Sequence, residues 1–188
     1  MGGYVDYIKD FPGRILEIYK NYLEKATHDR REVTFLLSLT ASGIAVPLYR
    51  LQEHKYYPDP FENRKEFNKA SKKFDELKVT NFRESELWDK AFEEWQYGKC
   101  SIGSICPDSW EKLSSAFIVE EVIRHLRDSL AHGVILTDVG KEIEQIQLFT
   151  GKKKEGLRVL LVTPRSLEIF LRKWVEWLQT LDVSIFRG

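Results

Sequence analysis

The sequence predicts a mainly α-helical single domain with a small β-hairpin before its last helix. Apolar residues recur every three to four positions in several long segments, and the period changes to two between Ile143 and Thr163. Prolines and glycines separate these segments. A chain of 188 residues is long enough for one core and too short for two ordinary domains, so we treat residues 1–188 as one domain.

The two N-terminal helices carry a strong periodic pattern. Pro12 precedes apolar residues at helical spacing as far as Ala26, and a second helix is predicted over about Arg30–Glu53. The stretch Val33–Tyr49 carries no charge and approaches the length of a membrane span. Its threonines, serines, glycine and proline dilute the hydrophobicity and suit close helix packing. We therefore predict a buried core helix and no membrane partner.

Residues 56–108 form a charged and aromatic-rich excursion, which we interpret as an insertion between core helices. The pattern predicts two helices, roughly Phe61–Lys78 and Glu84–Tyr97, followed by a loop over Gly98–Asp108. The aromatic residues near the second helix have two interpretations. Their helical spacing is typical of core packing, whereas exposed rings stack on nucleic-acid bases. These residues are Trp88, Phe92, Trp95 and Tyr97.

Two helices and a hairpin are predicted for the last third of the chain. One helix runs from about residue 114 to Ala131, and Gly133 suits the left-handed position that ends a helix. The hairpin covers about Ile143–Thr163, and the last helix covers about Pro164–Leu181. Lysines in the hairpin turn are candidates for binding an RNA backbone, although such a turn is more often simply solvated. They are Lys152, Lys153 and Lys154.

The helix predicted to end near Ala131 holds the densest set of reactive side chains. On a helical wheel at about 100° per residue, apolar residues gather on one side and ionisable residues on the other. Asp128 and His132 are four positions apart, so they can hydrogen-bond, and Asp128 would then orient the His132 ring. The ionisable row consists of Glu121, Arg124, His125, Asp128 and His132, with Arg127 on its flank.

This row has a structural and a functional interpretation. In the structural one, Arg124 pairs with Asp128 one turn away, and His132 interacts with the negative end of the helix. In the functional one, a histidine moves the proton of a ribose 2′-hydroxyl while an arginine neutralises phosphate charge. Arg127 and His132 are five residues apart and point to different sides. They converge only if the helix loosens or a second copy completes the site.

Composition narrows the classes of function. The 29 basic and 29 acidic residues give zero formal net charge, so any RNA contact requires a local patch. Cys100 and Cys106 lack the spacing of a zinc site, and we predict ordinary thiols, no metal and no cofactor. The first residues lack the basic head and apolar run of a secretory signal, so we expect a cytoplasmic protein.

The segment Arg127-Asp128-Ser129-Leu130-Ala131-His132 resembles the Arg-x4-6-His signature of the HEPN superfamily, in which a polar residue commonly follows the arginine. The motif ends a late helix of a mainly helical chain, and Val33–Leu51 is similar to the early core helix of the family. Two features depart from the pattern. Asp128 stands where asparagine is common, and the excursion and hairpin exceed a minimal four-helix version.

The resemblance implies a HEPN-like helical bundle that forms a homodimer through the motif helix. It also implies a metal-independent endoribonuclease that acts as a toxin or in antiviral defence, with a nucleotidyltransferase-like antitoxin as a further partner. Arg127, Asp128 and His132 would be catalytic, while Arg124 and His125 would bind phosphate or protonate the leaving oxygen. Members without clear catalysis imply the alternative of a noncatalytic HEPN-type dimerisation or binding module.

Overall fold

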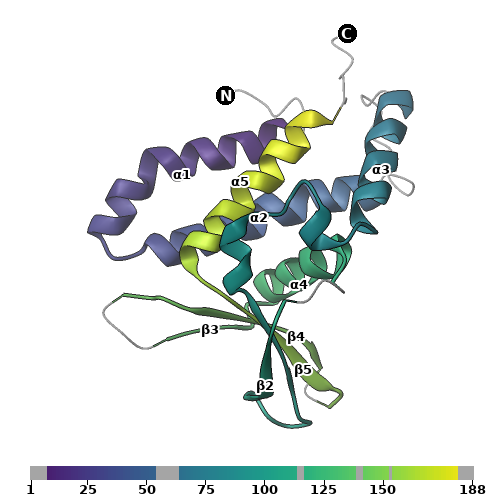
Figure 1. Cartoon of the computed structure of the whole chain (residues 1–188). Helices are drawn as coiled ribbons and strands as arrows, with labels where there is room; N and C mark the ends of the chain where they lie inside the picture. The colour runs from purple at the N-terminus through teal and green to yellow at the C-terminus, as the bar shows by residue number, and fades with distance from the viewer. Residues whose placement is uncertain (1–7, 54–63, 114–116, 139–141, 153, 182–188) are drawn as a thin grey trace.

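Five α-helices and one five-stranded antiparallel sheet make up the described part of the chain (Figure 1). The computed structural model describes residues 8–53, 64–113, 117–138, 142–152 and 154–181. Four helices agree with the predicted segments, although the fourth begins a turn later than expected. They are α1 (Asp10–His28), α2 (Glu32–Glu53), α4 (Val119–His132) and α5 (Pro164–Thr180). The mainly α prediction is confirmed for these helices and underestimates the sheet.

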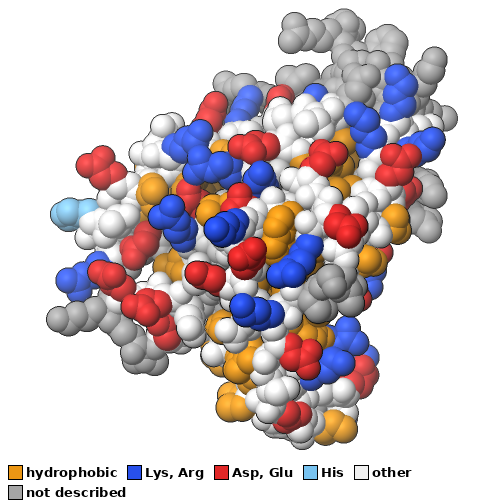
Figure 2. Space-filling view, viewed as in Figure 1, with side chains coloured by type: hydrophobic (Ala, Val, Ile, Leu, Met, Phe, Trp, Pro, Cys, Tyr) orange, Lys and Arg blue, Asp and Glu red, His pale blue; other side chains and the backbone are white. Residues whose placement is uncertain are grey.

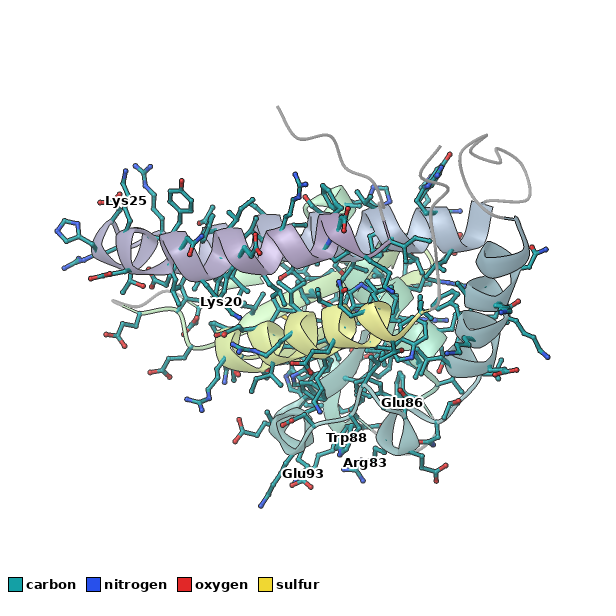
Figure 3. All side chains as sticks on the ribbon, turned by 90° about the horizontal axis from the view of Figure 1, so that it is seen from above. Lys20, Lys25, Arg83, Glu86, Trp88 and Glu93 are labelled. Atoms are coloured by element: carbon teal, nitrogen blue, oxygen red, sulfur yellow. The ribbon has the colours of Figure 1, made fainter. Side chains whose placement is uncertain are left out.

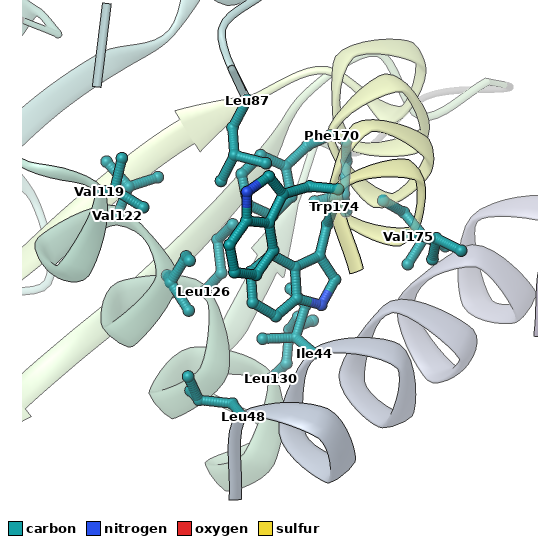
Figure 4. Packing of buried hydrophobic residues seen from close by; sticks show 14 of the residues in the cluster. Ile44, Leu48, Leu87, Val119, Val122, Leu126, Leu130, Phe170, Trp174 and Val175 are labelled. Carbon is teal, nitrogen blue, oxygen red and sulfur yellow. The ribbon is translucent and has the colours of Figure 1, made fainter. Parts of the chain in front are cut away.

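Helix α2 lies at the centre of the helical layer and contacts α1, α4 and α5. Gly43 permits the close approach of α5, because a Cβ atom there would lie 2.9 Å from the Leu171 side chain. The Gly43 carbonyl also accepts a hydrogen bond of 3.0 Å from the Trp174 indole. Figure 4 shows Trp174 beside Ile44 of α2 and Leu126 of α4, all fully buried. Helix α2 thus packs against α1, α4 and α5, and it also contacts α3 (Arg64–Lys78).

By length and composition, α2 is the one described helix that could cross a membrane, over Glu32–Leu51. The core helix of a soluble protein meets the same criterion. The packing of α2 against the other helices is that of the predicted core helix.

The excursion departs most from the prediction. Helix α3 (Arg64–Lys78) lies within the first predicted helix, but the second predicted helix, Glu84–Tyr97, is wrong. Two short 3₁₀ helices, η1 (Phe82–Glu84) and η2 (Lys90–Glu94), stand there instead. The Asn81 and Asp89 side chains accept hydrogen bonds from backbone amides two residues later. Such local bonds compete with a continuous helix and favour short turns.

The excursion then continues into the sheet rather than into a loop. Strands β1 (Gln96–Cys100) and β2 (Pro107–Lys112) pair with each other, so the predicted loop over Gly98–Asp108 is also wrong. Gly98 is required at this position, because a Cβ atom would lie 2.6 Å from the Pro107 Cβ. β1 also pairs with β5, so the insertion predicted at 56–108 shares its sheet with the C-terminal part of the chain.

The predicted hairpin is confirmed as β4 (Ile146–Lys152) and β5 (Gly156–Val162). It belongs to a larger sheet with the strand order β2-β1-β5-β4-β3, in which β3 (Ile135–Thr137) follows α4 directly. Helix α4 contacts α2 on one side and β4 on the other. The sheet extends below α4 and away from the other helices (Figure 1). α4 therefore lies between the helical layer and the sheet.

The aromatic residues of the excursion divide between two environments. Phe92 and Trp95 are fully buried, and the Trp95 indole donates a 2.7 Å hydrogen bond to Ser166 at the start of α5. These two residues confirm the core interpretation. Trp88 is half-buried, and the Arg83 guanidinium lies 5.3 Å from its ring centroid. This pair lies on the side of the molecule away from α1 (Figure 3).

Candidate functional site

Helix α4 separates an apolar face from a polar one, as the wheel predicts. The Glu121 carboxylate accepts a 3.2 Å hydrogen bond from the Ile118 amide at its start, and Gly133 ends it with φ of 64°. The left-handed conformation of Gly133 confirms the predicted helix end. The apolar face packs into the core through Val119, Val122, Ile123, Leu126 and Leu130.

Asp128 pairs with its neighbour Arg127 rather than with residues one turn away. The Arg127 Nε donates to Asp128 Oδ1 at 2.8 Å, and Nη2 lies 2.5 Å from the same oxygen. Arg124 instead binds Glu120 at 2.6 Å, so the ion pair predicted between Arg124 and Asp128 is wrong. Among the described residues, no hydrogen bond joins Asp128 to His132. The proposed orientation of His132 by Asp128 is therefore not formed within one chain.

The two central motif residues lie apart. His132 is exposed at the last position of α4, and it has no hydrogen-bond partner in the described ranges. Arg127 is half-buried and lines a small pocket of about 300 Å³ with Leu48 of α2 and Phe74 of α3. A single copy of the chain thus presents the arginine and the histidine on different sides of α4, as their five-residue spacing requires.

His125 has a structural role that the sequence pattern does not reveal. Its Nε2 lies 2.7 Å from the Leu148 carbonyl oxygen, which only accepts, so Nε2 carries the proton. Its Nδ1 lies 3.3 Å from Thr150 Oγ1 and accepts from that hydroxyl. Burial lowers the pKa of His125, against the opposing effect of the Leu148 hydrogen bond. A neutral ring with both nitrogens bonded links α4 to β4 and is poorly suited to bind phosphate.

A pocket of about 760 Å³ lies between the polar face of α4 and the end of the sheet. Four of the predicted site residues line it, namely Arg124, His125, Asp128 and Lys152. Arg127 and His132 are not among its lining residues. Lys152 also pairs with Glu155 at 3.3 Å, while Lys154 is exposed in the turn and Lys153 lies outside the described residues. The structure thus brings together three predicted binding residues, Arg124, His125 and Lys152, with Asp128, but it does not bring Arg127 and His132 together.

Several residues of this pocket, Lys99, Thr150 and Arg158 among them, were missed by the sequence analysis, whereas Tyr97 was one of its aromatic candidates for base stacking. Tyr97 and Lys99 come from β1, while Thr150 and Arg158 come from the β4–β5 hairpin. Burial raises the pKa of Tyr97, and the nearby Arg158 partly offsets this effect. The alternation of Tyr97 and Lys99 with Gly98 and Cys100 fits a strand. The helical spacing of the preceding aromatics obscured that short signal.

The HEPN pEK499 p136 family model matches residues 1–184, which include the motif helix, the excursion and the hairpin. This chain belongs to that HEPN family. Comparisons with curated proteins and with solved structures give no match. The resemblance first seen in the segment from Arg127 to His132 thus extends over nearly the whole sequence.

HEPN domains commonly bind RNA and dimerise. On the face seen in Figure 2, lysine and arginine side chains are interspersed with aspartate and glutamate, and this face carries no broad basic surface. No group of three or more metal-binding side chains gathers in the part of the chain that the structure describes.

Proposed function

We propose that this HEPN protein is an endoribonuclease that cleaves RNA without a metal and acts as a homodimer through α4. The observation that carries the proposal is the exposed His132 at the end of the family motif helix, with the cationic Arg127 less than two turns before it. An exposed imidazole near neutral pH is suited to proton transfer. A second copy of α4 would supply the residue that a single chain places on the wrong side of the helix.

In the proposed reaction, the neutral His132 removes the proton of a ribose 2′-hydroxyl. The 2′-oxygen forms a bond to the adjacent phosphorus, and the bond from phosphorus to the 5′-oxygen breaks. The upstream fragment then ends in a 2′,3′-cyclic phosphate, and the downstream fragment begins with a 5′-hydroxyl. Arg127 stabilises the negative charge that develops on the phosphorus oxygens.

The proton for the departing 5′-oxygen must come from another group. His125 is unsuited to this role because its ring is neutral and both nitrogens are bonded within the chain. Arginine side chains do not release a proton in proteins, and Arg124 already pairs with Glu120. We therefore assign this role to His132 of the partner subunit, which makes dimerisation part of the chemistry.

The decisive experiment incubates the purified protein with a defined RNA and with its all-deoxy counterpart. We expect cleavage of RNA alone, cyclic phosphate ends, and activity that survives a chelator. His132→Ala should lower the cleavage rate by roughly 10²- to 10⁴-fold, the usual contribution of a general acid or base. His28→Ala is the matched control, because His28 is also exposed at the last position of a helix. Cleavage of the all-deoxy strand would contradict the mechanism.

The ion pair between Arg127 and Asp128 favours a second candidate, a noncatalytic HEPN-type dimerisation or binding module. Asp128 occupies two donors of the arginine and adds a negative charge where phosphate would lie. A chain that dimerises but leaves RNA intact over a wide range of conditions would support this candidate. The toxin role, the cytoplasmic location and the nucleotidyltransferase-like antitoxin belong to the first proposal. Growth arrest on expression that His132→Ala relieves would support the toxin role.

A further inference from the structure

Two cations face each other across neighbouring strands at the floor of the 760 Å³ pocket. Lys99 of β1 is paired in register with Arg158 of β5, and the same row continues to Ser109 of β2 and Thr150 of β4. Register partners in a sheet project from the same face, so both cations point toward the pocket. Both residues are exposed, and neither forms an ion pair within the described ranges.

Like charges directly opposite each other destabilise a sheet. A carboxylate between them would offset this repulsion, and five acids line the pocket. Asp128 binds Arg127, Asp108 accepts both its hydrogen bonds from Ser101, Glu155 pairs with Lys152, and Glu121 accepts from the Ile118 amide. Glu111 of β2 lies opposite Tyr97, in the next row of the same face rather than between the two cations. An anion from outside the chain would relieve the repulsion between Lys99 and Arg158. Two cations on directly paired positions of neighbouring strands are suited to bind one phosphate group.

Two aromatic side chains, Tyr97 and Phe117, also line the pocket. Tyr97 stands next to Lys99 on the same face of β1, and its ring centroid lies 4.8 Å from that of Phe117. Both rings line the pocket and are only partly buried. An aromatic surface beside a pair of cations is the combination with which proteins bind single-stranded nucleic acid, because bases stack while cations hold the backbone.

The pocket is also continuous with the motif helix. Arg124 and Asp128 line its upper side, and His132 follows one helical turn after Asp128. Along the axis of α4, His125 and His132 are separated by about 10 Å, at 1.5 Å per residue. A strand held at the sheet would therefore extend along α4 toward the proposed cleavage site.

We infer that Lys99 and Arg158 bind a backbone phosphate of a single-stranded RNA, with an adjacent base placed against Tyr97 and Phe117. The identity of the strand rests on the proposed ribonuclease function. The site itself is separate from Arg127 and His132, and it is complete within one chain.

The test measures binding without cleavage. A fluorescent, short all-deoxy oligonucleotide has the same phosphates and bases but no 2′-hydroxyl, so the proposed reaction cannot consume it. Lys99→Gln and Arg158→Gln should each weaken its binding by about tenfold, the effect of losing one charge-assisted contact. Each should also reduce the slope of log affinity against log salt concentration by about 0.7. Lys112→Gln is the matched control, because Lys112 is an exposed cation of β2 in register with Gln96, on the other face.

Binding by both variants at the wild-type level would overturn the inference. AMP that bound as tightly as the oligonucleotide would indicate a free-nucleotide site and would overturn the assignment to a strand. Weak AMP competition that Lys99→Gln abolishes would support it. If the wild-type protein binds the oligonucleotide through Lys99 and Arg158 but never cleaves RNA, the proposed function fails and this site remains. If it cleaves RNA while both variants bind normally, only this site fails.

Discussion

The middle and the end of α4 each carry a histidine, and the two have opposite surroundings. His125 is held by the Leu148 carbonyl and the Thr150 hydroxyl, both on β4, whereas His132 is exposed and has no hydrogen-bond partner in the described chain. In the sequence both belong to one ionisable row. The difference arises because the sheet covers the middle of the helix and not its last turn. Position on a polar helical face therefore does not distinguish a structural histidine from a reactive one.

Mixing wild-type chains with His132→Ala chains should have the largest effect on the His132 side of this comparison. If both His132 rings of a dimer act in each site, a dimer with one variant chain has no complete site. An equal mixture after refolding should then retain about a quarter of wild-type cleavage, because only a quarter of the dimers are wild type in both chains. Cleavage assays on the mixture, with dimers shown by light scattering, test this expectation. Retention of about half would show that one His132 is sufficient for each site.

Removal of His125 and removal of His132 should have different effects on the free energy of unfolding. His125→Leu leaves the Leu148 carbonyl and the Thr150 hydroxyl without their described partner, which should lower the free energy of unfolding by about 1–3 kcal/mol. His132→Ala removes an exposed side chain and should change it by less than about 0.5 kcal/mol. Urea unfolding of both variants measures the contrast. Equal losses of stability would contradict the distinction between the two histidines.

The same two residues should differ in their response to pH. Burial holds the pKa of His125 below its ordinary value of 6.5, so the unfolded chain binds the proton more readily than the folded chain. The stabilising contribution of the neutral ring is present above pH 6.5 and decreases as the pH falls toward the folded-state pKa. His125→Leu should lose this part of the pH dependence, as measured by unfolding between about pH 5 and pH 8. A wild-type decline that His125→Leu left intact would contradict this assignment.

The smallest expected effect concerns the cation pair beside His125. Arg158→Gln removes the repulsion from Lys99 and should raise the free energy of unfolding by about 0.2–1 kcal/mol in the absence of RNA. Lys112→Gln, whose cation lies opposite Gln96, should leave it nearly unchanged. Unfolding at low salt gives the greatest sensitivity, because salt screens exposed charges. Destabilisation by Arg158→Gln would show that the arginine makes contacts beyond this charge pair.

The sequence predicted the elements whose signals are local. The apolar repeat of α1, α2 and α5, the left-handed Gly133 and the hairpin with period two are all confirmed. The second excursion helix was wrong, because Phe92 and Trp95 have helical spacing but are buried from 3₁₀ turns. One partner of β1, the strand β5, lies far along the chain, and local periodicity contains no information about such pairing.

The candidate site shows the same contrast between local signals, which the sequence contains, and long-range pairing, which it does not. The motif residues on α4 were identified from spacing within one helix, and their separation around the helix was predicted from its geometry. The pocket was not predicted, because Lys99 and Arg158 meet only through the register of β1 and β5. The pairing of Asp128 with Arg127 was also missed, since adjacent helical residues do not ordinarily face each other. The bond depends on the conformation of the long Arg127 side chain, which the sequence does not reveal.

The pairing of β1 with β5 has a consequence for the time at which the proposed phosphate site forms. During synthesis, β1 and α4 leave the ribosome well before β5. Lys99 gains its opposing arginine only after β5 has emerged and joined the sheet. A nascent chain that already carries the whole Arg127–His132 motif therefore still lacks the phosphate pocket. If the chain is the proposed nuclease, synthesised among ribosomal and messenger RNA, this order of assembly delays strand binding until the chain is nearly complete.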